Sequence, residues 1–498
     1  MKKNKMFYAL VLCVLFISYV VSAQRGIEKQ NIKVLYVGFN PKLERPTTSK
    51  FFNANSDRAR LDVISRWPAF MLYLNTRFTN VQAVDAREFK EEMSLDYDVT
   101  IIDELTTSIK EAVIEKDAEG NVTKYLPAAY LSGNYKSATI FVGKVGPDMG
   151  QSIGSKLDWS CLCLSGDAYN VKTEHPIFNT PEKVDLTFTT KKTPSNFYHY
   201  PNSSTIPKEI PSWRVQGLDF KNSDYQIGMV SRGAGFLDSP DTEYISGGDN
   251  TKSMDAVAIG RHGNLFLWGF SASPDYMTDE AQKVFSNAIV YMKNFNGVSL
   301  VAKKMNDRIK IRDSYLFFKN RDVTQENFNE FKSKWLKYKK KDFDRKKELE
   351  AKIANGEKLN KFQQSFLDKM EPIPTLDSWL PKQIGEDMYK KFGADINGYL
   401  SYLNTNKEYL IATDNDIIVD EDVKKLGVSN RKIELLENAV SLLDKGGKKA
   451  KLGKRVLDRY TEQSFTTTAE YKTWLTTNKD RLFFTESGGY KWLVNTVK

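Results

Sequence analysis

The sequence predicts a layered α/β domain, built on a doubly wound parallel sheet with antiparallel additions, and then a smaller, mostly α-helical domain. Short apolar strands alternate with helical patterns from about residue 31 to residue 294, which is typical of a parallel sheet covered by helices. Beyond residue 300 the strands stop and long, charged helical stretches follow. A length of 498 residues also exceeds what one hydrophobic core supports, so two or three domains are expected.

The first half of the chain alternates between the two kinds of pattern. Its strands are short and rich in Val, Ile and Phe, as in strands buried on both faces of a sheet. The expected strands are 31–39, 81–85, 97–103, 137–143 and 160–165, and the expected helices are 57–78, 86–93 and 149–157. Pro, Ser, Thr, Asn and Gly are frequent in the next stretch, 176–250, where short strands at 184–189 and 225–230 indicate antiparallel additions.

The stretch 255–294 is expected to close the α/β domain. Two strands, 256–260 and 264–270, flank a short turn that contains Gly263, where a positive φ costs little. Thr278 is the expected N-cap of the helix that follows. Apolar residues recur along this helix at intervals of three and four, so one face is expected to be buried. These residues are Ala281, Val284, Phe285, Ala288, Ile289 and Met292.

The second half is basic, and we place the two domains at 24–299 and 300–498. It holds 40 Lys and Arg against 30 Asp and Glu from residue 300 onward. The two signs are interleaved, especially along the helical stretch 303–352, which is the pattern of a solvated helix face. Nucleic acid is therefore not expected as a partner, whereas an acidic glycan stays open. Further helices are expected at 420–426, 432–443 and 451–460.

The first 23 residues predict an export signal. Lys2, Lys3 and Lys5 form a basic start, and the apolar run 6–21 is short for a membrane span. The small residues before Gln24 form a cleavage site. We therefore expect export to the periplasm or the outside of the cell, with no transmembrane segment after cleavage.

Cysteine and histidine are too sparse to predict a metal site or a cofactor. After cleavage the only cysteines are Cys161 and Cys163, whose spacing is poor for a disulfide and too sparse for zinc. They are expected as small buried side chains of a central strand. The three histidines, His175, His199 and His262, are scattered along the chain.

Two motifs suggest chemistry that their context disfavours. Gly150–Gly154 fits the pattern G-x-S-x-G, but a nucleophile elbow needs a strand leading directly into the serine. Here Ser152 falls inside an expected helix, so an ordinary helical serine is favoured. The acidic residues between Asp414 and Asp422 lack the glycine and the terminal glutamate of a calcium loop. Acids at the start of the helix near Asp420 explain most of that cluster.

Polar residues follow several of the expected parallel strands. In open parallel sheets, ligands bind beyond the carboxyl ends of the strands. His175 follows the last of these strands and is the best placed of the three histidines. Together with it, the candidate ligand-binding residues are Asn40, Asp103, Glu104, Lys144 and Asp167. Acids, an amide and a lysine at one crevice would suit a polyhydroxylated ligand such as a sugar, although loop residues that merely face water remain an alternative.

The order of these segments resembles the class I glutamine amidotransferase-like fold, which is flavodoxin-like, and within it the trehalose-utilisation (ThuA-like) branch. The resemblance covers about residues 31–296. It depends on the strands at 33–39, 97–103 and 137–143, on Glu174-His175-Pro176-Ile177, and on Gly260-Arg261 before Leu265-Phe266-Leu267. Amidotransferases of this fold carry a cysteine in the elbow after a central strand and a later His-x-Glu pair. Here the elbow is Gly143-Lys144-Val145-Gly146 and no His-x-Glu occurs, so glutamine hydrolysis is not expected.

The segment 459–474 is weakly similar to segments found beside HEAT-like helices in exported proteins, a similarity that implies no chemistry. Three functions stay open from the sequence. The favoured one is a non-catalytic binding or assembly protein of the cell envelope, with carbohydrate as its ligand. The others are a carbohydrate-active enzyme that uses the carboxylates at the strand ends, and a scaffold that binds an envelope protein through the helical half.

Overall fold

A computed structural model describes residues 28–43, 57–201, 205–217, 228–305, 310–414 and 416–497. It divides into two compact units, an α/β unit that comprises residues 1–309 and 480–498, and a helical unit that comprises Lys310–Lys479. The expected boundary between residues 299 and 300 thus falls shortly before the helical unit begins, and the last residues of the chain belong to the α/β unit. The predicted export signal at 1–23 lies outside the described residues.

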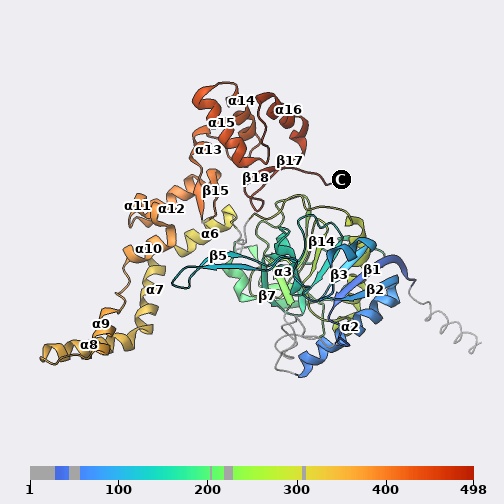
Figure 1. The fold of residues 1–498 in the computed structure, drawn as a ribbon, viewed down its shortest axis with the longest axis horizontal. Helices are drawn as coiled ribbons and strands as arrows, with labels where there is room; N and C mark the ends of the chain where they lie inside the picture. Colours follow the sequence, from blue (N-terminus) through green and yellow to red (C-terminus); the bar gives the residue numbers. More distant parts are fainter. Residues whose placement is uncertain are drawn as a thin grey trace, which may run out of the picture. The chain divides into compact units, whose positions relative to one another are not determined.

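The α/β unit is built on one ten-stranded sheet (Figure 1). In spatial order its strands are β2 (Phe78–Asp85), β1 (Gln30–Gly38), β3 (Val99–Ile102), β6 (Thr139–Val142), β14 (Leu265–Trp268), β13 (Ile259–His262), β12 (Thr242–Gly248), β8 (Asp167–Tyr169), β10 (Glu209–Arg214) and β9 (Phe188–Lys192). The strands from β2 to β14 are parallel and the others are antiparallel. The predicted fold class, a parallel sheet with antiparallel additions followed by helices, is therefore confirmed.

Both faces of the sheet are covered by apolar side chains. Successive residues of a strand point to opposite faces, so Val34 and Tyr36 of β1 join one core cluster while Leu35 and Val37 join another. The first cluster lies under α2 (Asp57–Arg77) and α5 (Asp279–Met292). The second lies under α3 (Val145–Gln151) and the short 3-10 helix η2 (Lys156–Asp158). Helices therefore lie on both sides of the sheet, as in a doubly wound fold.

Helix α5 forms as the sequence predicts. The Thr278 hydroxyl accepts a hydrogen bond from the Ala281 amide at 3.2 Å, which caps the first turn. All six apolar residues of the predicted face are buried. Among them, the Phe285 ring packs edge-on against Trp268 of β14 at a centroid distance of 5.1 Å. Burial of this face is what holds the helix on the sheet.

Two local predictions are corrected. The expected strand at 160–165 forms as β7 (Ser160–Leu164), but it pairs antiparallel with β11 (Gly228–Ser231) in a separate two-stranded sheet. Cys161 and Cys163 are joined in a disulfide, contrary to the expectation that they stay apart as buried side chains. Residues two apart on a strand point to the same side, and their Cα–Cα distance of 5.4 Å lies within the range that disulfides use.

Outside these two sheets, the α/β unit holds two hairpins. β4 (Val113–Lys116) and β5 (Val122–Leu126) pair with each other alone. The C-terminal hairpin, β17 (Leu482–Thr485) and β18 (Lys491–Val494), is joined to the rest of the unit through Asp238. The Asp238 carboxylate accepts hydrogen bonds from the Thr485 hydroxyl at 3.0 Å and from the Ser487 amide at 2.8 Å, and it pairs with the buried Lys156 ammonium at 2.6 Å.

The helical unit contains eleven described α-helices and the short strand pair β15 (Leu410–Ala412) and β16 (Ile417–Val419). The helices are α6 (Arg312–Asp322), α7 (Gln325–Tyr338), α8 (Lys340–Ala354), α9 (Lys361–Asp368), α10 (Leu376–Ile384), α11 (Glu386–Phe392), α12 (Ile396–Thr405), α13 (Glu421–Leu426), α14 (Glu434–Leu443), α15 (Gly447–Tyr460) and α16 (Thr468–Asn478). One core cluster, which includes Leu316, Trp379 and Tyr399, joins α6, α10 and α12 with the strand pair. None of the described helices is both long enough and apolar enough to cross a membrane.

The acidic cluster near Asp420 has the structural role that the sequence predicts. The Asp420 carboxylate caps α13 by accepting hydrogen bonds from the amides of Asp422 and Val423, at 3.0 and 3.3 Å. It also pairs with the Arg459 guanidinium at 2.5 Å and accepts a hydrogen bond from the Tyr460 hydroxyl at 2.9 Å. Its oxygens therefore bind groups of the protein itself.

Candidate functional site

Asp103 lies at the carboxyl end of β3, where the sequence places a ligand site. Its carboxylate is buried and forms a two-pronged ion pair with the Arg66 guanidinium, in which Nε lies 2.9 Å from Oδ2. The Tyr36 hydroxyl donates to the same oxygen at 2.8 Å. Burial, reinforced by this carboxylate, raises the pKa of Tyr36 well above its usual value. The guanidinium and the phenol thus occupy the oxygens of the Asp103 carboxylate with charge-assisted hydrogen bonds.

Asn40 lies beside a second carboxylate, Asp85 at the end of β2. The backbone N–H of Asn40 donates to the Asp85 carboxylate at 2.9 Å, and the Arg87 guanidinium donates to it at 2.6 and 2.7 Å. Although burial opposes it, these donors lower the pKa of Asp85. Asp85 was missing from the predicted site residues; its signal in the sequence is a carboxylate that ends a strand of the parallel sheet.

Glu104 and Lys144 complete the group at this edge. Glu104 is buried and its carboxylate accepts a hydrogen bond from the Leu105 amide at 3.1 Å. Lys144 is half-buried and precedes the first turn of α3. Before it, Gly143 turns the chain with a φ of +59°, and a Cβ there would lie 3.2 Å from Ser271. Because β1, β3 and β6 are neighbours in the sheet, the structure brings Asn40, Asp103, Glu104 and Lys144 to one edge.

The structure does not bring Asp167 to this group. The sequence predicts that the strand at 160–165 belongs to the parallel sheet and ends near Asp167, whereas Asp167 is the first residue of β8. β14, β13 and β12 separate β8 from β6, which at about 4.8 Å per strand is roughly 19 Å. Its buried carboxylate pairs with Lys191 at 2.7 Å and with Arg214 at 3.2 Å.

His175 lies near the amino ends of the parallel strands, opposite the group at their carboxyl ends. It contacts Glu243 at the start of β12, which runs in the same direction as those strands. Its Nε2 is 3.4 Å from the Glu243 carboxylate, and its ring packs against Tyr291 with a centroid distance of 4.9 Å. Glu243 also accepts hydrogen bonds from Arg261 at 2.8 and 2.7 Å. Although burial opposes it, Arg261 and the other donors lower the pKa of Glu243 to about 2. His175, Arg261 and Tyr291 thus all contact the Glu243 carboxylate or one another.

The remaining sequence candidates do not form a catalytic relay. Ser152 follows the last residue of α3, not a strand, and its hydroxyl donates to the Leu131 carbonyl at 2.8 Å. His262 is fully buried; its Nδ1 accepts from the Lys156 amide at 3.0 Å, and its Nε2 is 3.3 Å from Asp241. Burial lowers the pKa of His262, because a low-polarity interior disfavours the imidazolium. Ser152 and His262 are therefore held by separate parts of the core.

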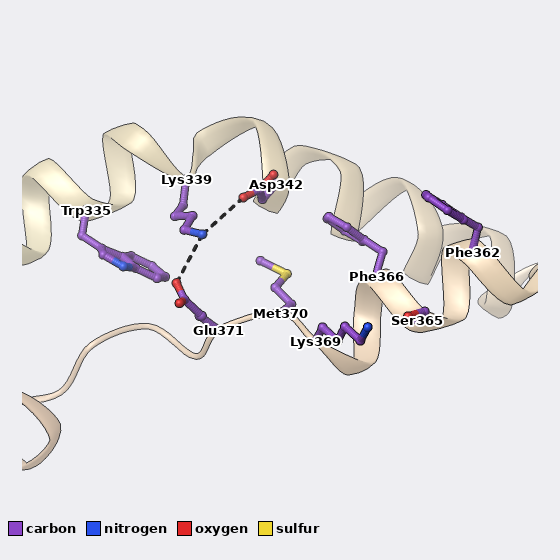
Figure 2. Close-up of a pocket in the computed structure, with 9 residues that line it drawn as sticks. All are labelled: Trp335, Lys339, Asp342, Phe362, Ser365, Phe366, Lys369, Met370 and Glu371. Carbon is purple, nitrogen blue, oxygen red and sulfur yellow. Dashed lines mark ion pairs between the residues drawn. The ribbon is translucent and has the colours of Figure 1, made fainter. Parts of the chain in front are cut away.

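A groove in the helical unit was not predicted (Figure 2). It measures about 490 Å³ and lies between α7, α8, α9 and the chain that follows α9. Lys339 spans it, pairing with Glu371 at 3.2 Å and with Asp342 at 3.8 Å. The lining residues are Trp335, Lys339, Asp342, Phe362, Ser365, Phe366, Lys369, Met370 and Glu371. The sequence signal that could have revealed it is the set of large apolar residues within an otherwise charged helical stretch.

The walls of the groove are apolar and its rim is charged. Phe362 is 81% exposed, although it belongs to a described helix. Phe366 packs beneath the Arg345 guanidinium at 4.6 Å from the ring centroid. Trp335 contacts Phe343 edge-on at 5.7 Å. Aromatic walls with a few charged groups at the rim are the usual composition of a binding site.

Comparison of the chain with protein-family models and with curated proteins finds no match. The ThuA-like resemblance consequently stays an expectation from the sequence segments that suggested it. Within the described part of the chain, no group of three or more His, Cys, Asp or Glu side chains is arranged to hold a metal ion.

Proposed function

We propose that this chain is an exported, non-catalytic binding or assembly protein, and that its helical unit binds a partner protein. The observation that carries the proposal is the groove of about 490 Å³ between α7, α8 and α9, with its aromatic walls. The N-terminal pattern of three lysines, an apolar run and small residues supports export.

The state of the carboxylates supports a non-catalytic role. A catalytic carboxyl group must lie within hydrogen-bond reach of its substrate. At the sheet edge, Asp103 and Asp85 are each paired with an arginine, and Asp167 is paired with two cations elsewhere. These ion pairs argue against a reaction at the strand ends.

The distribution of apolar surface supports a protein partner. The helical unit exposes six large apolar side chains among its described residues, and five of them lie between residues 331 and 373. They are Phe331, Tyr338, Ile353, Phe362 and Ile373. Apolar groups that gather on one part of a surface mark an interaction site more often than single scattered ones.

The test is capture of the partner by the full-length mature chain. A photo-crosslinking residue at Phe362 should give a defined product with an envelope extract of the source cells, and the same residue at Ile418 should not. Ile418 is a matched control, since it is exposed in the same unit but does not line the groove. The captured protein is then purified, and its affinity should fall at least tenfold for Phe366→Ala and stay unchanged for Ile418→Ala. Equal crosslinking from both positions would overturn the proposal.

A second candidate, carbohydrate binding, is favoured by the convergence of Asn40, Glu104 and Lys144 at one edge of the sheet. A thermal-shift screen of the mature chain against neutral and acidic saccharides tests it. A sugar at about one hundred times its dissociation constant stabilises the protein by roughly 2.7 kcal/mol. The shift should disappear in Glu104→Gln and persist in Glu115→Gln, whose exposed carboxylate lies on the separate hairpin β4–β5. A screen without any shift rejects this candidate.

A further inference from the structure

The segment 325–371, which we call the helical arm, contains α7, α8, α9 and the residues that follow α9. In Figure 1 its outer helices α8 and α9 lie apart from α12 and α13 of the same unit. The arm holds thirteen Lys and Arg against nine Asp and Glu. Its basic excess is greatest along α7 and α8, where 332–352 contains ten basic and four acidic residues.

Within the arm, a larger fraction of the acidic residues than of the basic residues takes part in ion pairs. Glu330, Asp344 and Glu350 each pair with a lysine one helical turn away, and Asp342 and Glu371 share Lys339. Several lysines keep no carboxylate within 4 Å among the described residues. They are Lys337, Lys341, Lys347, Lys352 and Lys369. The charged residues that line the groove are Lys339, Lys369, Asp342 and Glu371. Because Lys339 pairs with both acids, Lys369 is the lining charge that keeps no carboxylate within 4 Å among the described residues.

The outer part of the arm cannot bury its own apolar face. Leu349 is the one fully covered apolar side chain in the described residues of α8 and α9. Phe362 and Ile353 are exposed, and Trp335 and Phe366 are only partly covered. Most of the stability of a helix in a protein comes from packing of its apolar face. Two helices with one covered apolar side chain therefore leave a face for another element to cover.

We propose that the occupant is an acidic amphipathic helix of the partner protein. This inference rests on the proposed function, because it names the chemistry of the partner for the same groove. A groove of this size takes a few apolar side chains, and an amphipathic helix presents such side chains on one face at i, i+3 or i+4, and i+7. An acidic residue beside that face can pair with Lys369 at the groove, and the other acids of such a helix are attracted by the basic excess of α7 and α8. Complementary charge of this kind steers association and sets the orientation of the helix.

A lipid surface fits the arm less well. The groove is concave, with Trp335 of α7 and Met370 of the chain after α9 lying between that chain and the helices α7 and α8 (Figure 2), whereas a bilayer surface is flat. The apolar face of an amphipathic helix can enter such a groove, so the shape of the groove favours a protein helix over a lipid surface.

Three labelled peptides and the full-length mature chain test the inference by fluorescence anisotropy. The first is a helical peptide with Leu and Phe along one face and Glu on the other. The second has the same composition in scrambled order, and the third has Lys in place of each Glu. The first should bind at least tenfold more tightly than either control, and its affinity should fall as salt rises, because screening weakens the charge contacts. Equal affinity for the Glu and Lys peptides would overturn the inference.

Substitutions separate charge recognition from simple damage to the arm. Lys369→Glu combined with Lys341→Glu should weaken binding of the acidic peptide and strengthen binding of the lysine peptide. A loss of folding would weaken the binding of both peptides, and Ile418→Ala should change neither.

Binding to vesicles of an anionic phospholipid, with no peptide preference, would replace the inference by a membrane contact. If Phe362 crosslinks a partner that the acidic peptide does not displace, the proposed function stands and this inference fails. If Phe362 captures no partner, the proposed function fails on its own terms.

Discussion

The carboxyl edge of the sheet and the helical arm use the same kinds of residue in opposite ways. At the sheet edge, the carboxylates of Asp85 and Asp103 are tied to arginines, and the apolar side chains beneath them are buried. Along the arm, several lysines, Lys369 among them, have no carboxylate within 4 Å among the described residues, and large apolar side chains such as Phe362 are exposed. Residues that are paired or buried already contribute to folding, whereas unpaired and exposed ones have interactions left to make. The difference indicates that the edge mainly holds the fold together and that the arm is the place to look for a partner.

The largest difference in the effect of substitution on the free energy of unfolding is expected between two phenylalanines. Phe285 is fully buried between Phe70 and Trp268, so Phe285→Ala should lower the free energy of unfolding by about 3–5 kcal/mol through lost burial and a cavity. Phe362→Ala should change it by less than about 0.5 kcal/mol, since the side chain is exposed. Urea denaturation of the full chain measures both. Comparable losses of stability would mean that Phe362 is part of a core, and would contradict the view that the arm leaves apolar side chains exposed.

Arg66→Met tests whether the Asp103 pair is structural. It would leave a buried carboxylate without its cation, which typically costs about 3–5 kcal/mol. The matched control is Lys124→Met on the exposed hairpin β4–β5, where both partners of the Lys124–Glu115 pair are about half exposed and the expected cost is at most about 1 kcal/mol. Chemical denaturation at neutral pH compares the two. An Arg66 variant that is as stable as the control would free Asp103 for ligand binding and reopen the enzyme hypothesis.

Glu243 gives a smaller, pH-dependent effect. Its pKa is lowered from 4.5 to about 2 by Arg261 and other donors against the opposing effect of burial, so its pairing stabilises the protein above pH 4.5 and is lost as pH falls through 2. A shift of this size corresponds to about 3 kcal/mol. Between pH 6 and pH 2, the free energy of unfolding should therefore fall by about that much more in the wild type than in Glu243→Gln. Parallel pH profiles would show that the Glu243 cluster does not stabilise the fold.

The free energy of local opening should be smaller in the arm than in the sheet. Amide hydrogen exchange measures local opening, which is easy where few apolar contacts are buried. Amides of α8 and α9 should exchange much faster than those of β1 and β14, and an acidic helical peptide should slow exchange in the helices that line the groove, α7, α8 and α9, but not in β1 or β14. Protection of the arm equal to that of the sheet, in the free protein, would contradict the view that its apolar face lacks a cover.

Many elements of both units could be predicted because their signals are local. The apolar period of 281–292 is that of α5, the hydroxyl of Thr278 caps it, and Asp420 caps α13. The site could be predicted only in part. Asn40, Asp103, Glu104 and Lys144 meet because β1, β3 and β6 are neighbours, but Asp167 and His175 do not join them. Their positions depend on β7 and β8 leaving the parallel order, which no local pattern specifies.

By itself, the sequence determined the class of the fold, the order of most strands and helices along the chain, and the caps that begin α5 and α13. Tertiary structure alone decided that β14 lies beside β6, that Arg66 pairs with Asp103, that the hairpin β17–β18 is bound by Asp238, and that α7, α8 and α9 enclose a groove. The two sets of features differ in how far apart along the sequence the interacting residues lie. Helix periods and caps come from side chains a few positions apart, whereas strand order and ion pairs depend on which distant partners bury the most apolar surface once the loops between them have closed.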